Sequence, residues 1–413
     1  MTGEGFLSGR RLQLARGVLL QCIMGGYPPA RFYGSDDGDL ALVAEPTQVH
    51  RLPWSNTPRA FAICDAQELD GTPSGLSTRG LLKQVVARYA AHGWQPVVAT
   101  ELEFFVFAPN TDPNEPFQAP LGPDGRRELG YSAFSVSSNN GLRPFFEDVY
   151  RCMDALGLVR DTFMHEMGTS QFEINFLHGD PVLLADQTFL FKHLLKEVAL
   201  KHGLIVVCMA KPLAKTPGSS MHIHQSIVEL DGGRNIFSEA DGEPSAAFRH
   251  FIGGQQACLA DFTPFFAPHV NSFQRLCHPY ASPNNACWSH DNRAAGLRIP
   301  ASGASARRVE NRLPGADANP YLALAASLLC GYIGMVEGIK PSAQVKGRGY
   351  ERRNLRLPLT IEAALERMEN CKPLEQYLGS KFISGYVAVK RAEHENFKRV
   401  ISSWEREFLL LSV

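Results

Sequence analysis

Four short segments of this chain alternate charged or imidazole side chains with apolar ones, and this pattern constrains the fold more than any other feature. They span residues 97–107, 170–176, 221–227 and 307–313. Alternation with a period of two is typical of a β-strand, because successive side chains point to opposite faces of a sheet. The polar faces carry Glu101 and Glu103 in the first segment, Gln171, Glu173 and Asn175 in the second, His222 and His224 in the third, and Arg308, Glu310 and Arg312 in the fourth.

The chemistry of these polar faces indicates a site for cations and an anionic ligand. A single strand of this kind would indicate nothing, because a half-solvated antiparallel sheet always has a polar face. Four faces made mainly of Glu, His and Arg are different, since neighbouring carboxylates repel one another and raise each other's pKa unless cations lie between them. Carboxylates with an imidazole suit Mg²⁺ or Mn²⁺ better than zinc, and interleaved arginines match the oxygens of a carboxylate or phosphate. We therefore expect a metal site that binds an anionic substrate.

Composition excludes several other classes of protein. Lys and Arg number 41 and Asp and Glu 42, so no overall positive field attracts nucleic acid or an anionic membrane, and we expect neither partner. The nine cysteines are scattered and form no CxxC pair, which indicates reduced thiols and a cytoplasmic location rather than a disulfide framework. The apolar run at residues 322–336 is shorter than the about 20 residues of a membrane span, so we expect a buried core helix.

A turn-rich stretch near residue 72 divides the chain into two expected domains. Residues 1–72 are short apolar runs separated by turn signals, which predicts a small β-rich domain. Residues 73–413 alternate helical and strand-like patterns, which predicts a larger α+β domain. The expected helices span residues 78–92, 142–156, 181–202, 246–262, 318–338, 360–371 and 384–408.

The motifs of the larger domain occur in a known order. The stretches ATELEFFVF, HEMGTSQFEINF, GSSMHIHQS, NSFQRL, DNRAAGLRIP and ARRVENRLPGADANPYLALAA resemble the motif series of the class I glutamine synthetase family, from about residue 73 to the C-terminus. The resemblance implies a β-grasp-like domain at residues 1–72, truncated relative to the family, and a catalytic domain at residues 73–413 with a curved antiparallel sheet backed by helices. It also implies a homo-oligomer, either a hexameric ring or stacked rings, with active sites between subunits.

The activity that the resemblance implies is an ATP-dependent ligation. ATP, bound with Mg²⁺ or Mn²⁺ at two or more metal sites, phosphorylates the γ-carboxylate of glutamate, and an amine then displaces phosphate. This chemistry agrees with the charged faces, because transferring a phosphoryl group to a carboxylate brings two anions together, and metals and arginines must neutralise both.

The resemblance also assigns roles to individual residues. The ligands of a metal near glutamate and the amine are matched by Glu103, Glu166 and Glu173. The ligands of a metal that bridges the ATP phosphates are matched by Glu101, His222 and Glu310. Contacts to glutamate are matched by Arg275, Arg312 and Gly218, and contacts to the nucleotide by Arg298, Arg308 and His224. The expected catalytic residues are Arg293, which stabilises the transferring phosphoryl group, with Glu173 and Arg275.

Two of these residues have an equally ordinary structural interpretation. His224 could be a polar residue whose hydrogen bonds are satisfied beside His222, and Arg308 could be a surface arginine at a strand end.

The sequence departs from the family where ammonium is bound. The family's flap carries an acidic residue that helps to deprotonate ammonium, and Ala281 stands at the matching position. A second acidic residue, from the N-terminal domain of the neighbouring subunit, has no counterpart in residues 20–24. A neutral pocket disfavours a small cation and favours a hydrocarbon group, whose burial contributes about 25 cal/mol per Å². We therefore expect a hydrophobic or aromatic monoamine as substrate, deprotonated by solvent, by His278 or by a carboxylate near the metal.

Other interpretations remain open at this stage. A polyamine such as putrescine is the alternative amine substrate. A divergent glutamine synthetase, acting on ammonium, is an alternative function. A nucleotide- and metal-binding regulator without catalysis would explain the absent flap carboxylate, although it would not require Arg293. A phosphagen-kinase-like enzyme ranks last, because that group lacks this motif series. Arg356 lies where the family's adenylylated tyrosine is expected, so we expect no control by adenylylation.

Overall fold

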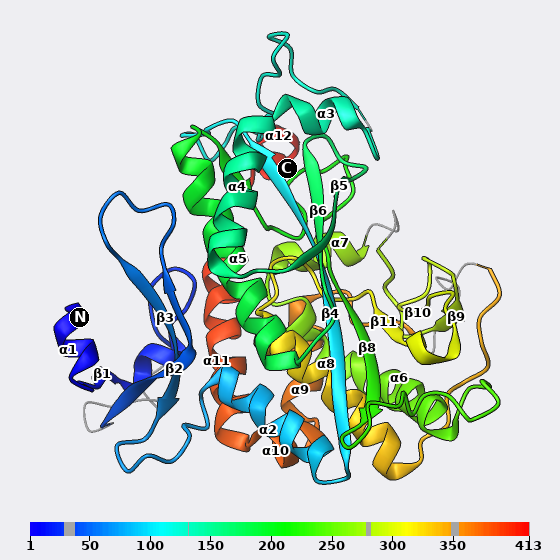
Figure 1. The fold of residues 1–413 in the computed structure, drawn as a ribbon. Helices are drawn as coiled ribbons and strands as arrows, with labels where there is room; N and C mark the ends of the chain where they lie inside the picture. Colours follow the sequence, from blue (N-terminus) through cyan, green and yellow to red (C-terminus); the bar gives the residue numbers. More distant parts are fainter. Residues whose placement is uncertain (29–37, 131, 278–281, 348–354, 413) are drawn as a thin grey trace.

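The computed structural model describes residues 1–28, 38–130, 132–277, 282–347 and 355–412 of the chain (Figure 1). The flap residues Ala281 and His278 lie outside these residues. The described chain contains two β-sheets and a set of helices packed behind the larger sheet, which confirms the predicted α+β class.

The smaller sheet is antiparallel and is formed by the N-terminal part of the chain. Its strands are β1 (Leu12–Ala15), β2 (Asp39–Arg51) and β3 (Ala60–Gln67), in the order β1-β2-β3. A short helix, α1 (Gly3–Leu7), precedes it, and a 3₁₀ turn, η1 (Arg16–Leu20), follows β1. The β-rich character expected for residues 1–72 is therefore present, and its status as a separate truncated β-grasp-like domain stays a prediction.

The larger sheet joins the four segments in which the sequence predicted charged faces. Its strand order is β5-β6-β4-β8-β11-β10-β9, and β7 pairs with the end of β4. Among the described strands, each pairing in this sheet is antiparallel except that between β10 and β9, which is parallel. The strands are β4 (Trp94–Phe107), β5 (Arg160–His165), β6 (Gln171–Phe176), β7 (Ile205–Val207), β8 (Met221–Glu229), β9 (Trp288–His290), β10 (Leu297–Ile299) and β11 (Val309–Asn311). The four predicted strands are thus the consecutive neighbours β6, β4, β8 and β11.

Helices cover the apolar face of this sheet. Helices α2 and α5 pack against β4, and α6 packs along α8 (Figure 1). The contact of α6 with α8 needs glycine, because a Cβ on Gly254 would lie 2.2 Å from the carbonyl oxygen of Cys330. The helices are α2 (Thr78–Ala90), α3 (Val136–Gly141), α4 (Arg143–Leu156), α5 (Pro181–Lys201), α6 (Ala246–Phe266), α7 (Val270–Cys277), α8 (Pro320–Glu337), α9 (Ile361–Glu369), α10 (Lys372–Leu378), α11 (Ser380–Phe397) and α12 (Ser403–Leu409).

The apolar helix α8 belongs to the core, as predicted. Among the described residues it is the one helix long and apolar enough to cross a membrane. However, 89% of its 18-residue span is buried inside the protein. It lies between α6 and the helices α2 and α5, so its apolar surface is covered by the protein itself.

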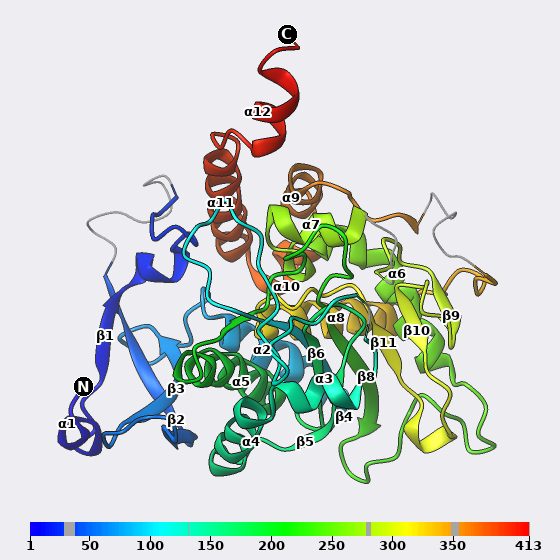
Figure 2. The same ribbon diagram turned by 90° about the horizontal axis from the view of Figure 1, so that it is seen from above.

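The prediction of a single helix over residues 384–408 is wrong. Two helices occupy this region, and α12 continues beyond the end of α11 after a turn (Figure 2). Ser402 caps the start of the second helix. Its hydroxyl accepts a hydrogen bond from the Glu405 backbone N–H, and the Glu405 carboxylate accepts one from the Ser402 N–H. This reciprocal capping starts a new helix. The sequence prediction missed the break because the apolar residues keep a helical spacing across it.

A buried ion network joins the smaller sheet to the helices of the larger domain. Arg79 on α2 donates to Asp65 on β3 at 2.7 Å and to both carboxylate oxygens of Asp186 on α5 at 2.9 Å. The hydroxyl of Tyr321 donates to Asp186 at 2.7 Å. Asp186 is fully buried, so it depends on these partners to offset the loss of solvent.

A second contact ties the N-terminal segment to α11. The Glu393 carboxylate accepts a hydrogen bond from the backbone N–H of Ile23 at 2.9 Å and from the Lys390 ammonium at 2.7 Å, and His269 lies 3.6 Å away. Burial alone would raise the pKa of Glu393, but His269 and Lys390 lower it to about 2. The ionised carboxylate is therefore favoured by folding.

We predict that Glu393→Gln destabilises the protein in a pH-dependent manner. The folded pKa of about 2 lies below the ordinary value of 4.5, so the contribution is complete above about pH 4.5 and is lost as the pH falls toward 2. We expect the free energy of unfolding of the variant to be lower by about 2 kcal/mol at pH 7 and to approach that of the wild type near pH 2 to 3. Urea midpoints at several pH values test this, with the exposed Glu369→Gln as control. A difference that is constant with pH would contradict it.

Candidate functional site

The register of the larger sheet brings the predicted polar faces into direct opposition. Glu103 on β4 lies opposite Glu173 on β6, and Glu101 lies opposite His222 on β8. His224 in turn lies opposite Glu310 on β11. Side chains that face each other across neighbouring strands are within about 5.5 Å at their Cβ atoms, so the period-two pattern builds a continuous charged surface across the sheet.

Two groups on this surface have the geometry to hold a metal ion. Glu101, Glu173 and His222 form one group, and Glu101, His224 and Glu310 form the other, with the candidate ligand atoms of each group all within 4.8 Å of one another. Carboxylate oxygens with one imidazole suit Mg²⁺ or Mn²⁺. Four of the six predicted metal ligands, Glu101, Glu173, His222 and Glu310, belong to these groups, and His224 is a further member. Which of the six residues bind the same metal stays a prediction.

The carboxylates on β4 and β6 carry more negative charge than their surroundings compensate. Burial and the nearby Glu166 raise the pKa of Glu103 to about 7. Burial and the charge of Glu103 raise the pKa of Glu173 to about 9. Among the described residues, the donors that hydrogen-bond to Glu103 are neutral: the Ser220 N–H at 2.8 Å and the Gln171 amide at 3.3 Å. A divalent cation would relieve this repulsion, so these residues fit a metal.

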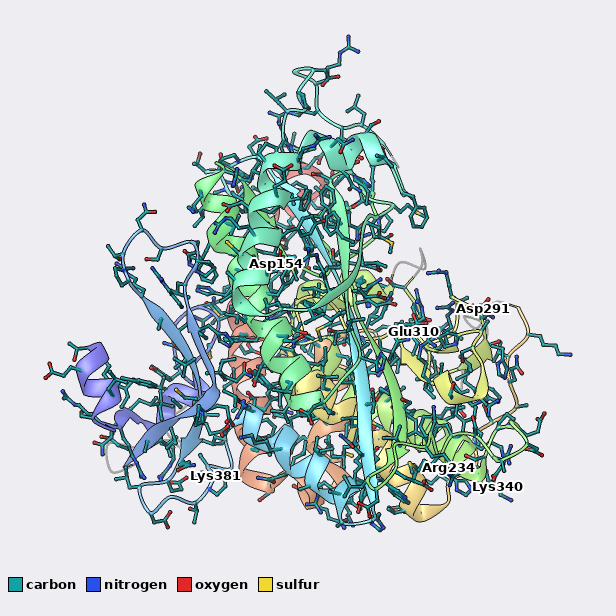
Figure 3. The ribbon with its side chains drawn as sticks, viewed as in Figure 1. Asp154, Arg234, Asp291, Glu310, Lys340 and Lys381 are labelled. Carbon is teal, nitrogen blue, oxygen red and sulfur yellow. The ribbon has the colours of Figure 1, made fainter. Side chains whose placement is uncertain are left out.

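The other end of the charged surface is rich in arginine. Glu310 is fully buried between the guanidinium groups of Arg312 and Arg298, the latter at 2.7 Å. Burial alone would raise the pKa of Glu310, but Arg312 and His222 lower it to about 2. Asp291 also accepts from Arg298, at 2.6 Å, and Figure 3 shows both acids at the β9–β11 end of the sheet. The sequence identified Arg298 but missed Asp291, although that residue lies within the motif DNRAAGLRIP.

Two histidines connect the carboxylate and arginine ends. The Nδ1 atom of His222 lies 3.1 Å from Glu101, and the Nε2 atom of His224 lies 2.7 Å from it. Burial and the positive charge of Arg312 lower the pKa of His222 to about 4, so this imidazole is neutral and able to bind a metal. The Nε of Arg308 donates to Nδ1 of His224 at 3.1 Å. His224 and Arg308 are thus paired with each other, which is compatible with both their structural and their nucleotide-binding interpretations.

A cavity of about 310 Å³ lies beside His224 and Arg308. Its lining includes Glu101, His178, His224, Ser305 and Arg308. The lining combines the Arg308 cation and hydrogen-bonding groups with apolar residues such as Val97 and Phe176, which suits a polar ligand with an apolar part.

The Arg275 side chain hydrogen-bonds to backbone carbonyl groups, a contact that its predicted role does not require. It is buried, and it donates to the carbonyl oxygens of Arg312, Leu313 and Pro314 at 3.0 to 3.1 Å. Gly218 touches it from the other side: a Cβ there would lie 2.8 Å from the Arg275 side chain and 2.3 Å from the Ala210 carbonyl oxygen. Arg275 therefore holds the chain that follows β11 in place, and a direct contact with glutamate stays a prediction.

Arg293 is placed differently from the other arginines. It is exposed in the turn between β9 and β10, and the structure gives it no hydrogen bond or ion pair with the residues it describes. Its neighbour Asn292 shapes this turn, accepting from the Ala294 N–H at 3.0 Å and donating to the Gly347 carbonyl oxygen at 2.7 Å. An unpaired guanidinium on a structured turn is available to an incoming anion.

We predict that Mg²⁺ or Mn²⁺ raises the melting temperature of the wild-type protein, and that Glu101→Gln and Glu173→Gln abolish most of that rise. A ligand at 100 times its Kd stabilises a protein by about 2.7 kcal/mol, which corresponds to a shift of several degrees. Calorimetry with and without metal measures it. Glu229→Gln, an exposed substitution at the far end of β8, is the matched control. Equal metal-induced shifts in all four proteins would contradict the assignment.

Comparisons with known proteins agree with this geometry. The family model "Glutamine synthetase, catalytic domain" matches residues 75–409. Gamma-glutamylethanolamide synthetase GlnA4 of Streptomyces coelicolor is 33% identical over 89% of this chain and 78% of its own length. A glutamine synthetase of Pyrococcus abyssi is 32% identical over 89% and 81%, and a glutamate–isopropylamine ligase of a Pseudomonas species is 31% identical over 91% and 82%.

A solved structure shows the same fold. The structure described as GmaS without ligand superimposes with a TM-score of 0.80 at 29% identity, covering 92% of this chain and 86% of that one. The family match spans most of the chain, and the sheet carries its charged residues on neighbouring strands in the order that the motifs predicted. The chain belongs to the glutamine synthetase family.

Proposed function

We propose that this protein is a ligase that uses ATP to join the γ-carboxylate of glutamate to an amine through γ-glutamyl phosphate, and that the amine carries a hydrophobic or aromatic group. The observation that supports this most is the continuous charged surface across β6, β4, β8, β11 and β10, with carboxylates at one end and arginines at the other. The relatives that act on glutamate and an amine support the reaction class.

The reaction needs two bond exchanges. A γ-carboxylate oxygen of glutamate attacks the γ-phosphorus of ATP, the bond from that phosphorus to ADP breaks, and an acyl phosphate forms. The amine then attacks the acyl carbon, the carbon–oxygen bond to phosphate breaks, and the proton lost from nitrogen passes to a base. Both reactants of the first step are anions, so the step depends on fixed positive charge.

The residues of the charged surface suit these demands. Metal ions held by Glu101, Glu103, Glu166, Glu173, His222 and Glu310 would neutralise phosphate charge when bound. Arg308 and His224 border the cavity of about 310 Å³, which we assign to the nucleotide together with Arg298. Arg312 and Gly218, with Arg275 behind them, are assigned to glutamate. Arg293, which is exposed and unpaired among the described residues, is assigned to the phosphoryl group in transit.

Two features of the sequence favour an amine larger than ammonia. The flap position is Ala281 rather than an acid, and residues 20–24 contain no acid either. Ile23, in that segment, is 71% exposed. Without these carboxylates a small ammonium ion loses its opposite charge, whereas a hydrocarbon group keeps the free energy of its burial. The glutamine synthetase of Pyrococcus abyssi is about as similar to this chain as the amine ligases are, so ammonium is one competing substrate for the test. Putrescine, the alternative amine of the sequence analysis, is the other.

We infer further that the protein forms a ring of identical subunits, a single hexamer or stacked rings. Family membership and the exposed apolar side chains of Ile23, Met24 and Tyr27 support this. A molar mass of one chain in solution would contradict it.

We predict that phosphate release from ATP in the presence of Mg²⁺ and glutamate depends on an added alkyl or arylalkyl monoamine and is weak with ammonium or putrescine. A phosphate assay with product mass measured by mass spectrometry tests this. Release with ammonium alone would make the protein a divergent glutamine synthetase. The absence of release with every amine would contradict the ligase and favour a nucleotide-binding regulator.

Two arginine variants test in the same assay whether turnover depends on the residues assigned to the site. Arg293→Ala should lower kcat by about 10² to 10³ with little change in ATP binding, because we place its interaction in the transition state. Arg308→Ala should act chiefly on the KM for ATP. Activity of Arg293→Ala within a few-fold of the wild type would contradict its role.

A further inference from the structure

Three non-glycine residues among those described have a positive φ. They are Phe134 at 61°, Ser170 at 56° and Asp291 at 45°. Side chains with a Cβ adopt this conformation at a cost in free energy, so it persists only where the surroundings impose it, often at functional sites. Asp291 holds Arg298, and Ser170 lies in the turn between Glu166 and β6. Phe134 has no such evident task in the fold.

Hydrogen bonds fasten the segment that contains Phe134 to the loop that carries Glu166. The Phe134 N–H donates to the His165 carbonyl oxygen at 2.9 Å, and the Thr169 hydroxyl donates to the Gly130 carbonyl oxygen at 2.9 Å. The Glu128 carboxylate accepts from the Ser170 N–H at 2.9 Å and lies 3.1 Å from Nε2 of His165. The buried His165 ring is therefore held on both sides, since its Nδ1 lies 2.7 Å from the Glu166 carbonyl oxygen.

These contacts place Phe134 at the anionic end of the charged surface. The backbone of Phe134 is bonded to the residue that immediately precedes Glu166, and the charge of Glu166 acts on both Glu103 and Glu173. ATP phosphates are attracted to the opposite, arginine-rich end. The proposed function places the amine at this carboxylate end, because Glu103, Glu166 and Glu173 match the ligands of the metal near glutamate and the amine. The amine therefore approaches beside the loop that holds Phe134.

The Phe134 ring is exposed rather than packed into the core. Its exposed fraction is 72%, and the neighbouring Leu129, Val136 and Met167 are also exposed apolar residues. A large apolar side chain that is both exposed and held on a costly backbone is not explained by stability, because core packing gains nothing from it.

We propose that Phe134 is a specificity-determining residue that contacts the hydrocarbon group of the amine substrate, and that Glu128 and His165 position it. This inference rests on the proposed ligase function and adds which residue selects the amine. The ring offers apolar area to a carbon substituent and offers nothing to ammonium, so it favours the larger amine at the step where the substrate binds.

The decisive experiment compares the wild type with Phe134→Gly and Phe134→Tyr in the phosphate-release assay, using benzylamine, isopropylamine and ammonium. Glycine tolerates the positive φ, so Phe134→Gly should fold with an unchanged melting temperature. We expect its KM for benzylamine to rise about tenfold or more, while the KM values for glutamate and ATP change less than about twofold. Phe134→Tyr should keep most of the preference for benzylamine over ammonium. Leu121→Ala, an exposed apolar substitution in the same connection between β4 and α4, is the control and should change nothing.

The positioning pair has its own test. Glu128→Ala should raise the KM for benzylamine in the same direction as Phe134→Gly, and Glu128→Gln, which retains an oxygen that can accept from the Ser170 N–H, should restore it in part. An unchanged ratio of kcat/KM for benzylamine to that for ammonium in Phe134→Gly would overturn this inference alone, provided that the wild type turns over benzylamine. A wild type that turns over no amine would overturn the ligase proposal and this inference together.

Discussion

The repulsion among buried carboxylates on adjacent strands is the constraint on which the site depends. Glu103 faces Glu173 across the β4–β6 pair, and Glu166 lies close enough to raise the pKa of Glu103 further. Such a cluster is costly unless cations bind within it. At the other end of the sheet the cost of burying a carboxylate is offset within the protein itself, because Glu310 lies between Arg298 and Arg312. The protein thus presents two unlike ends, one that requires cations and one that already contains them, and a reaction between ATP and a carboxylate needs both.

The rest of the fold holds this surface rigid. Helices α2 and α5 cover the opposite face of β4, and α6 and α8 approach closely enough that glycine is required between them. Arg275 ties down the chain after β11 through three carbonyl oxygens, although it lies beside the site. Rigid support of this kind keeps charged groups at fixed separations, and electrostatic catalysis depends on such fixed groups because they need no reorganisation during the reaction.

The sequence predicted the site well where side chains alternate regularly. The period-two pattern gave the faces of β4, β6, β8 and β11, and the family motifs showed that these strands belong together. It could not give β9 and β10, because the residues in and around these strands do not alternate charged and apolar side chains as the other four segments do. It also could not give the carbonyl contacts of Arg275, because these depend on tertiary packing. The break between α11 and α12 was missed because apolar spacing continues across Ser402, whose capping role was visible only in its pairing with Glu405. Phe134 lacked any local signal, since its conformation is imposed by contacts with the loop at residues 165–170.

Transfer of isotope from glutamate to phosphate tests the central claim most directly. Glutamate labelled with ¹⁸O in both γ-carboxylate oxygens is supplied with ATP, Mg²⁺ and an amine that supports turnover, and the released phosphate is analysed by mass spectrometry. Activation of the carboxylate by phosphorylation predicts one ¹⁸O atom in each phosphate, because the oxygen that attacks ATP leaves with phosphorus when nitrogen displaces it. Unlabelled phosphate, with both ¹⁸O atoms still on glutamate, would contradict the account.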